Sequence, residues 1–344
     1  MLRFDCDYNN GCHPEVLGRL VATNGEYSGT YGADAFSEGA KARIRAACGD
    51  PSAEVFFLAG GTQTNATVID CLLQPWQGVV AAETGHIAVH EAGAVEYTGH
   101  KVITLPEHDG RIASAELEAL MAAFRSDETN THMAEPALVY ISFPTEVGTL
   151  YPAKELAEIH GVCRKYGMKL FVDGARLAYG LEAAGNDVSL EYLAAHCDAF
   201  YIGGTKCGAL CGEAVVFPRG GTPVRFFTRI KQHGALLAKG RVTGVQFDAL
   251  FTGGLYSRIG RHADELAMRL QEVFRRHGIG AGKPSATNQQ FFILTDSLAE
   301  ALGRHAAFEK WSPVAPGKAL YRFVTSWATT EEDIDRLDEI LETI

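Results

Sequence analysis

Short apolar runs alternate with segments of helical period between residues 37 and 217. Seven of these runs have the length and the β-branched or aromatic content of strands. They lie at residues 54–59, 78–82, 102–105, 137–142, 169–173, 198–202 and 213–217. Helical segments between them include residues 37–48, ending before Gly49, and residues 153–166, ending before Gly167. This alternation predicts an α/β fold with a mostly parallel sheet flanked by helices.

After about residue 244 the pattern changes to a long helical stretch, a strand at 290–294, a helix, a strand at 320–325 and a last helix. Thr330 and Asp333 stand in capping-box spacing at the start of that last helix, with Asp in place of the usual Glu or Gln. We therefore predict an N-terminal segment over residues 1–25, a large α/β domain over 26–244 and a smaller α+β domain over 245–344.

Charge and cysteine usage narrow the classes of partner and compartment. The chain has 42 acidic and 31 basic residues, a net charge of −11, and no run of five Lys or Arg, so we expect neither a nucleic-acid nor a membrane partner. It has no signal-peptide pattern and no apolar stretch near the ~20 residues of a membrane span. Its eight cysteines form no CxxC pair and no compact framework, which predicts reduced thiols in a cytoplasmic protein.

A lysine and an aspartate follow predicted strands at the edge where α/β proteins bind ligands. Lys206 lies just beyond the strand at 198–202, and Asp173 ends the strand at 169–173. A lysine with an acidic partner for a pyridine nitrogen is the protein signature of pyridoxal 5′-phosphate (PLP). Taken singly, Lys206 also fits a solvated loop, and Asp173 a helix cap or an ion pair with Arg176.

A glycine turn indicates a phosphate site. Residues 60–65, Gly-Gly-Thr-Gln-Thr-Asn, follow a strand and open a helical run, so free backbone N–H groups point towards a ligand at the helix start. Such a sequence also occurs as a plain turn. Neither GxGxxG nor the P-loop pattern occurs, which disfavours dinucleotide and nucleoside triphosphate binding.

Two further side chains suit the same chemistry. His86 follows the strand at 78–82 and can stack on a pyridine ring. His86 and His90 also have the spacing of two metal ligands on a helix, but Glu91 does not complete HExxH, so we expect no metal. Arg322 alternates out of an apolar strand, where its guanidinium suits a substrate carboxylate or a surface ion pair.

These motifs together resemble the low-specificity L-threonine aldolases, which belong to the β-eliminating-lyase group of fold-type I PLP-dependent enzymes. The resemblance runs in the family's order from about Asp7 to the end of the chain. The residues that carry it are Gly61-Thr62-Gln63 with Asn65, His86 with Glu91-Ala92-Gly93, Val172-Asp173-Gly174-Ala175-Arg176, Thr205-Lys206 and Arg322-Phe323-Val324-Thr325.

The resemblance implies a role for each of these positions. Lys206 would carry PLP as a Schiff base, Asp173 would pair with its ring nitrogen, and His86 would stack on the ring. The cofactor phosphate would bind at the start of the helix and beside the lysine. Arg176 would hold the cofactor hydroxyl region or the substrate carboxylate, and Arg322 the carboxylate. By the same resemblance, Gly61 and Thr62 would take the phosphate, and Gln63, Thr205 and Arg241 would also bind the cofactor.

The resemblance also implies a homodimer or homotetramer with shared active sites. The segment around Tyr31 is similar to the family's tyrosine-glycine loop, which reaches a neighbouring subunit's site, and Arg241 lies in a similar basic loop contributed across the dimer. Two departures concern the substrate: Glu146 stands about where many members have a histidine, and Asn10 stands near the family's N-terminal Thr and Ser positions.

The implied reaction is retro-aldol cleavage of L-threonine, L-allo-threonine or a related β-hydroxy-α-amino acid to glycine and an aldehyde. The group that removes the β-hydroxyl proton is left open between His86 and a water held by His90 or Glu146. A PLP-dependent lyase that eliminates a β-substituent from another amino acid is the nearest alternative. A nucleotide-binding or regulatory protein on a doubly wound fold is the alternative from another class.

Overall fold

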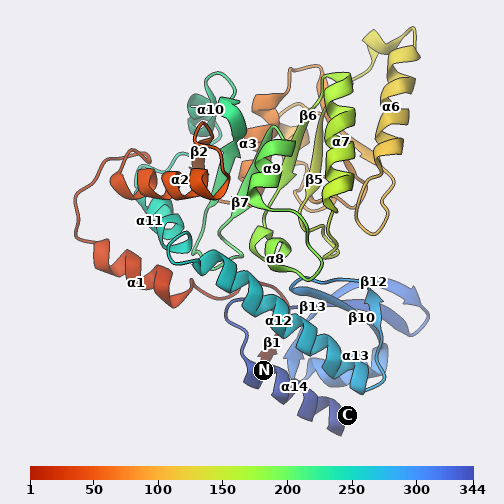
Figure 1. The fold of residues 1–344 in the computed structure, drawn as a ribbon. Coiled ribbons are helices and arrows are strands. Elements are labelled where there is room, and N and C mark those ends of the chain that lie inside the picture. Colours follow the sequence, from red (N-terminus) through yellow and green to blue (C-terminus); the bar gives the residue numbers. More distant parts are fainter.

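The computed structural model describes residues 1–344 and has a seven-stranded sheet at its centre (Figure 1). The strand order is β2-β8-β7-β6-β5-β3-β4, and β8 alone is antiparallel to its neighbours. All seven predicted strands are present, which confirms the mostly parallel α/β prediction. Their bounds are β2 Glu54–Leu58, β3 Gln77–Ala82, β4 Val102–Leu105, β5 Glu135–Ser142, β6 Lys169–Asp173, β7 Ala199–Gly203 and β8 Glu213–Phe217.

Helices cover both faces of this sheet, because its strands are apolar on both sides. In β3, Val79 and Ala81 pack into one core, and Val80 and Ala82 into the other. One face is covered by α3 Gly61–Leu72, α4 His86–Val89, α5 Ala94–Tyr97 and α10 Phe226–Gln232. The opposite face is covered by α2 Ala35–Ala47, α6 Ser114–Ser126, α7 Ala153–Tyr166, α8 Leu177–Glu182, α9 Leu190–His196 and α11 Arg241–Leu250.

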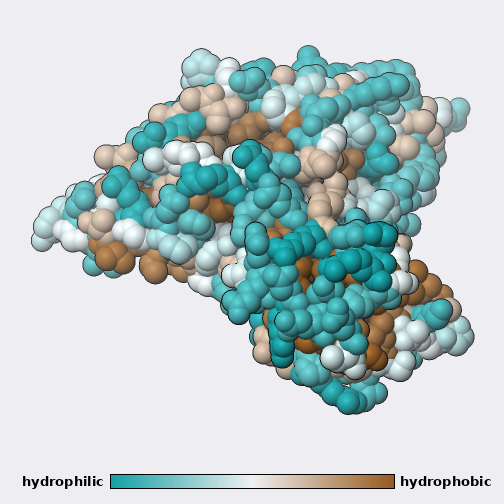
Figure 2. All heavy atoms as spheres, turned by 60° about the horizontal axis from the view of Figure 1, so that its bottom comes forward, coloured by the Kyte–Doolittle hydropathy of each residue, from teal (hydrophilic) through white to brown (hydrophobic).

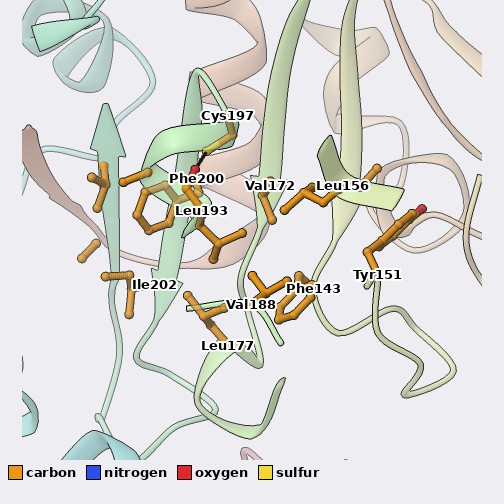
Figure 3. Close-up of a cluster of buried hydrophobic side chains, with 14 of the residues drawn as sticks. Phe143, Tyr151, Leu156, Val172, Leu177, Val188, Leu193, Cys197, Phe200 and Ile202 are labelled. Atoms are coloured by element: carbon orange, nitrogen blue, oxygen red, sulfur yellow. Dashed lines mark hydrogen bonds between the residues drawn. The ribbon is translucent and has the colours of Figure 1, made fainter. Parts of the chain in front are cut away.

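The larger of the two cores lies directly behind the strand ends of β6 and β7. Figure 3 shows Val172, Phe200 and Ile202 of these strands packed among side chains that include Leu177 and Leu193. Interiors of this kind are close-packed and yield little. The core therefore gives a rigid base to the chain that leaves β6 and β7.

A smaller antiparallel sheet forms the C-terminal part of the molecule, in the order β12-β13-β10-β9. The predicted strands at 290–294 and 320–325 correspond to β10 and β13. The sequence pattern did not indicate β12, which is largely exposed and contains Pro313, a residue type that argues against a strand. The elements are β9 Ala281–Lys283, β10 Gln289–Thr295, α13 Asp296–Gly303, β12 Glu309–Ala315, β13 Lys318–Val324 and α14 Glu331–Thr343.

The long helical stretch after residue 244 begins in α11 and continues, after a break, in α12 Leu255–Arg276, which links the two parts of the molecule (Figure 1). Gly253 and Gly254 separate the two helices with positive φ angles of 58° and 71°. Along α12, Ala263 still packs into the larger core of the central sheet. Leu266 packs into a third core, which lies in the C-terminal part of the molecule and is called the small core below. The division at residues 244 and 245 falls inside α11 and stays a prediction.

The N-terminus returns to the C-terminal part of the chain. Strand β1 Leu2–Arg3 pairs in parallel with β11 Ala306–Ala307, and Phe4 is buried in the small core. Helix α1 Pro14–Thr23 then leads back to the large sheet. The remaining elements are two short 3₁₀ helices, Asn130–His132 and Pro218–Gly220.

In the view of Figure 2, hydrophilic side chains predominate, and the apolar patches between them are small. No helix combines the length and the apolar character needed to cross a bilayer.

Candidate active site

Lys206 lies in the turn after β7 and lines a cavity of about 330 Å³ at the carboxyl ends of the parallel strands. Its Nζ makes no hydrogen bond or ion pair and lies 5.8 Å from the ring centre of Tyr8. Burial lowers the pKa of the Lys206 ammonium, and the positive charge of Arg176 lowers it further. A lysine with a lowered pKa is available as a nucleophilic amine.

Backbone contacts fix the turn that carries this lysine. The Tyr179 hydroxyl donates to the Lys206 carbonyl at 2.6 Å, and the Gly204 N–H donates to the Glu213 carboxylate at 2.9 Å. A Cβ at Gly203 would lie 2.2 Å from the Ala175 carbonyl oxygen, so glycine is needed where β7 passes the loop after β6.

Asp173, at the end of β6, is a buried carboxylate in the wall of the same cavity. It accepts hydrogen bonds from the Tyr140 hydroxyl at 2.5 Å, the Asn65 amide at 2.9 Å and the Ala175 N–H at 2.9 Å. Burial alone would raise the pKa of Asp173, but the charge of His86 and these side-chain hydrogen bonds outweigh it and lower the pKa. Asp173 therefore stays ionised and can pair with a protonated ring nitrogen.

His86 begins α4 and also lines the cavity. Its Nδ1 lies 2.7 Å from Oε1 of the buried Glu91, which also accepts from the Asn65 amide at 2.8 Å. A carboxylate at Nδ1 holds the proton there and fixes the ring orientation, which leaves Nε2 free. The sequence motif contained Glu91, but only the structure gives it this orienting role.

Arg176 is held by a residue that the sequence analysis did not select. Its Nε and Nη2 donate to the two carboxylate oxygens of the buried Asp7 at 2.7 and 3.0 Å, while Nη1 makes no hydrogen bond. Burial alone would lower the pKa of Arg176, but Asp7 outweighs it and raises the pKa. The two residues are 169 positions apart, so no local pattern could indicate the pair. Nη1 remains available to an anionic ligand in the cavity.

The start of α3 forms another wall of the cavity, with Gly60, Gly61 and Thr62 in its lining. Gly60 occupies the N-cap position and has no side chain to cap the first amides of the helix, so these amides can bind an anion. Thr205 is also in the lining of the cavity. Gln63 instead donates to the His233 carbonyl at 3.1 Å and does not line the cavity.

Two more carboxyl groups line the cavity. Glu146 accepts hydrogen bonds from the His86 N–H at 2.9 Å and the Ser142 hydroxyl at 2.6 Å, and burial raises its pKa. Glu213, which the sequence analysis did not select, accepts from the Thr205 hydroxyl at 2.8 Å. Burial raises the pKa of Glu213 to about 7.

Besides Gln63, four predicted site residues do not line this cavity within the single chain. Asn10 lies in a separate hollow beside Ser326 and Asp333. Tyr31 lines a third hollow, next to the start of α11. Arg241, at the start of α11, donates from Nη2 to the Thr23 carbonyl at 2.6 Å.

Arg322 is the fourth of these residues and lies on β13 of the small sheet. It donates to Gln289 at 3.0 Å, pairs with Glu309 and stacks 5.0 Å from the ring centre of Trp311. Burial lowers its pKa, and the positive charge of Arg176 adds to this effect. The two guanidinium groups are therefore close enough to influence each other.

The sheet order, the small C-terminal sheet and the cavity with its lysine and aspartate define a fold-type I PLP-enzyme architecture. The aspartate aminotransferase of Thermus thermophilus has this fold, with a TM-score of 0.68 at 15% identity. Residues 20–297 match the family model described as β-eliminating lyase, and the chain belongs to that family.

Three of the proteins that match over nearly the whole length carry the name threonine aldolase. The low-specificity L-threonine aldolases of a Pseudomonas species and of Pseudomonas aeruginosa are each 29% identical, over 97% and 98% of this chain and 95% of each relative. A solved structure of the Leishmania major threonine aldolase is 39% identical, with a TM-score of 0.96, and covers 100% of this chain and 99% of that one.

Proposed function

We propose that this chain is a PLP-dependent aldolase that cleaves L-threonine, L-allo-threonine or related β-hydroxy-α-amino acids to glycine and an aldehyde. The observation that carries the proposal is the placement of an unpaired lysine amine, Lys206, in one cavity with the ionised Asp173. The activity of the relatives named above supports the choice of reaction.

The residues present fit the cofactor. The uncapped amides of Gly61 and Thr62 would hold its phosphate. Asp173 would hold the proton on its ring nitrogen, and Lys206 would bind it covalently. The buried Thr64 hydroxyl, in the first turn of α3, has no hydrogen-bond partner in the chain. Bound PLP supplies a ring that accepts the electrons of a bond broken at the α-carbon.

The chain itself binds and orients the substrate. Nη1 of Arg176 has no protein partner and would bind the α-carboxylate, with the neighbouring positive charge of Arg322 adding to the attraction. Holding the carboxylate at one side of the cavity determines which α-carbon bond is presented for cleavage. His86, fixed by Glu91, would hold the cofactor ring from one face.

An absorption spectrum tests the cofactor. Purified protein given PLP should show a visible band that borohydride bleaches, and Lys206→Ala should lose this band together with aldolase turnover. The matched control is Lys154→Ala, since Lys154 is 88% exposed, and it should behave as the wild type. A chain that shows no band after PLP is added, or a Lys206→Ala variant with wild-type turnover, would overturn the proposal.

Product analysis separates the alternative chemistry within the same family. An aldolase releases glycine and acetaldehyde from threonine, whereas a β-eliminating lyase releases ammonia and a 2-oxo acid. Release of ammonia and 2-oxobutyrate without glycine would identify the second reaction.

The assembly and compartment are parts of the same proposal. A homodimer or tetramer would give the Tyr31 loop and Arg241 a site in a neighbouring subunit, and both lie outside the cavity of their own chain. Eight cysteines, all free thiols, support a cytoplasmic location.

A further inference from the structure

The two carboxylate oxygens of Glu146 have different environments. Oε1 accepts both hydrogen bonds described above, from the His86 N–H at 2.9 Å and the Ser142 hydroxyl at 2.6 Å. Oε2 has no hydrogen-bond partner in the protein, and Glu146 lines the cavity that holds Lys206. One oxygen is thus fixed by the protein, and the other is left for a ligand.

A closed ring of contacts fixes this orientation. From Glu146 it passes through Ser142 to the Tyr140 hydroxyl, 3.3 Å from Ser142 Oγ, and on to Asp173. The Asn65 amide then links Asp173 to Glu91. Glu91 contacts the His86 ring, and the His86 N–H returns to Glu146. The carboxyl group is therefore coupled to the groups expected to hold the cofactor ring.

The other two candidates for the proton acceptor are less well placed. Nδ1 of His86 is occupied by Glu91 at 2.7 Å, and a ring that lies flat against a cofactor directs its remaining nitrogen along the ring plane. His90 is exposed, does not line the cavity, and has its ring 6.2 Å from that of Trp311. Of the three candidates, Glu146 is the one that lines the cavity with an unpartnered carboxylate oxygen whose orientation is fixed through its other oxygen.

We propose that Glu146 Oε2 accepts the proton of the substrate's β-hydroxyl group during aldol cleavage. This inference rests on the proposed function. The O–H bond breaks as the proton moves to Oε2, the O–H electron pair becomes the second C–O bond of the aldehyde, and the Cα–Cβ bond breaks. The Cα–Cβ pair stays with the α-carbon, where a proton replaces the aldehyde fragment to give glycine.

The charged surroundings of Glu146 suit an acceptor that must also release its proton. Burial raises the pKa of this carboxyl, and the negative charge of Asp173 on β6 raises it further. The other titratable groups around it are Tyr140 on β5, Tyr151, and His86 on α4. A carboxylate with a raised pKa is a stronger base than an exposed one.

The test is Glu146→Gln, which keeps an oxygen for the His86 N–H and loses the basic Oε2. We expect threonine cleavage to fall by about 10²-fold or more, as is usual on loss of a general base. The loss of activity below the pKa of Glu146 should also disappear from the pH profile of kcat/KM. The control is Glu128→Gln, an exposed residue without a hydrogen bond or ion pair, which should keep the wild-type rate and profile.

A second readout uses no β-hydroxyl group. Exchange of a glycine α-proton with D₂O, followed by NMR, needs Lys206 and the cofactor but not a base for the hydroxyl. Glu146→Gln should therefore keep the PLP absorption band and exchange glycine within about threefold of the wild type, whereas its aldol cleavage is lost. Formate should restore part of the cleavage rate to Glu146→Ala by supplying a carboxylate in the vacated space.

The outcomes separate this inference from the proposed function. Wild-type protein that cleaves threonine, with Glu146→Gln equally fast and unchanged in pH profile, would overturn the role of Glu146 alone. Parallel loss of glycine exchange and cleavage in Glu146→Gln would also overturn it, because the residue would then act on the cofactor rather than on the hydroxyl. Wild-type protein that neither exchanges glycine nor cleaves threonine would overturn the proposed function itself.

Discussion

Three of the four carboxyl groups in the cavity wall differ in their hydrogen bonds and nearby charges. Asp173 receives three hydrogen bonds and the charge of His86, which keep it ionised. Glu146 and Glu213 receive fewer compensating interactions, and burial raises the pKa of both. Carboxyl groups whose pKa values are separated in this way can serve different roles in one site. We assign ring pairing to Asp173 and proton transfer to Glu146.

Glu213 should make the stability of the fold depend on pH. Its pKa rises from an ordinary 4.5 to about 7 in the folded state, so the folded chain keeps a proton that the unfolded chain releases. The contribution of Glu213 to stability is fully present below pH 4.5 and is lost as the pH rises through 7, by up to about 3 kcal/mol. Glu213→Gln removes this titration, and its unfolding free energy, measured with urea, should lose that part of the pH dependence.

The control for this measurement is Glu128→Gln, because Glu128 is exposed and makes no hydrogen bond or ion pair. It should retain the pH dependence of the wild type. Equal slopes for Glu213→Gln and the wild type between pH 5 and 7 would contradict the raised pKa.

At the scale of elements, the site is made where strands end. β5, β6 and β7 run parallel, so Ser142, Asp173 and Gly203 come to one edge of the sheet. Helix α3 begins at the same edge and adds its uncapped amides. The apolar strand interiors thus determine the fold, and the residues just beyond them determine the chemistry.

The last helix, α14, has an N-terminus that can be tested by itself. Its capping box is present as predicted: the Thr330 side chain accepts from the Asp333 N–H at 3.2 Å, and the Asp333 side chain accepts from the Thr330 N–H at 2.8 Å. Thr330→Ala should lower the unfolding free energy by about 1 kcal/mol in urea titrations. Thr343→Ala, at the other end of the helix, should change it by less than about 0.5 kcal/mol. Equal effects of the two substitutions would show that the cap does not contribute.

At the scale of the whole molecule, the N-terminal segment completes both parts of the structure. Phe4 fills the small core, and a few residues later Asp7 reaches Arg176 in the cavity. Asp7 also accepts from the Asn288 amide at 2.9 Å, next to β10 of the small sheet. The cavity therefore depends on three segments that are far apart along the chain.

A mixing experiment tests whether active sites are shared between subunits. We expect Tyr31→Ala and Lys206→Ala to have little activity alone, because one would lack the donated tyrosine and the other the reactive lysine. Reassociated mixtures should recover up to about a quarter of wild-type turnover, since half of random dimers are mixed and each has one intact site. A mixture of Lys154→Ala with Lys206→Ala gives the reference turnover, because only the Lys206→Ala subunits of that mixture carry a defect. Mixtures no more active than their components would contradict shared sites.

Much of the architecture follows from local patterns in the sequence. The seven apolar runs form the large sheet because a strand buried on both faces must be apolar throughout, and the turn glycines and caps mark where helices begin and end. Lys206, Asp173, His86 and Gly61 could be selected because each lies at the end of a strand or within a few residues of it. Strand β12 could not be predicted in this way, because it is an exposed edge strand that contains Pro313.

What the sequence by itself determined is the order of strands and helices and the chemical groups at the strand ends, because these depend on neighbours within a few residues. The tertiary structure decided which distant groups meet. It paired Asp7 with Arg176, placed Glu213 against Thr205, and fixed one oxygen of Glu146 while leaving the other free. The physical reason is that charge, burial and hydrogen bonding act through space, and chain separation does not encode the distance between the groups.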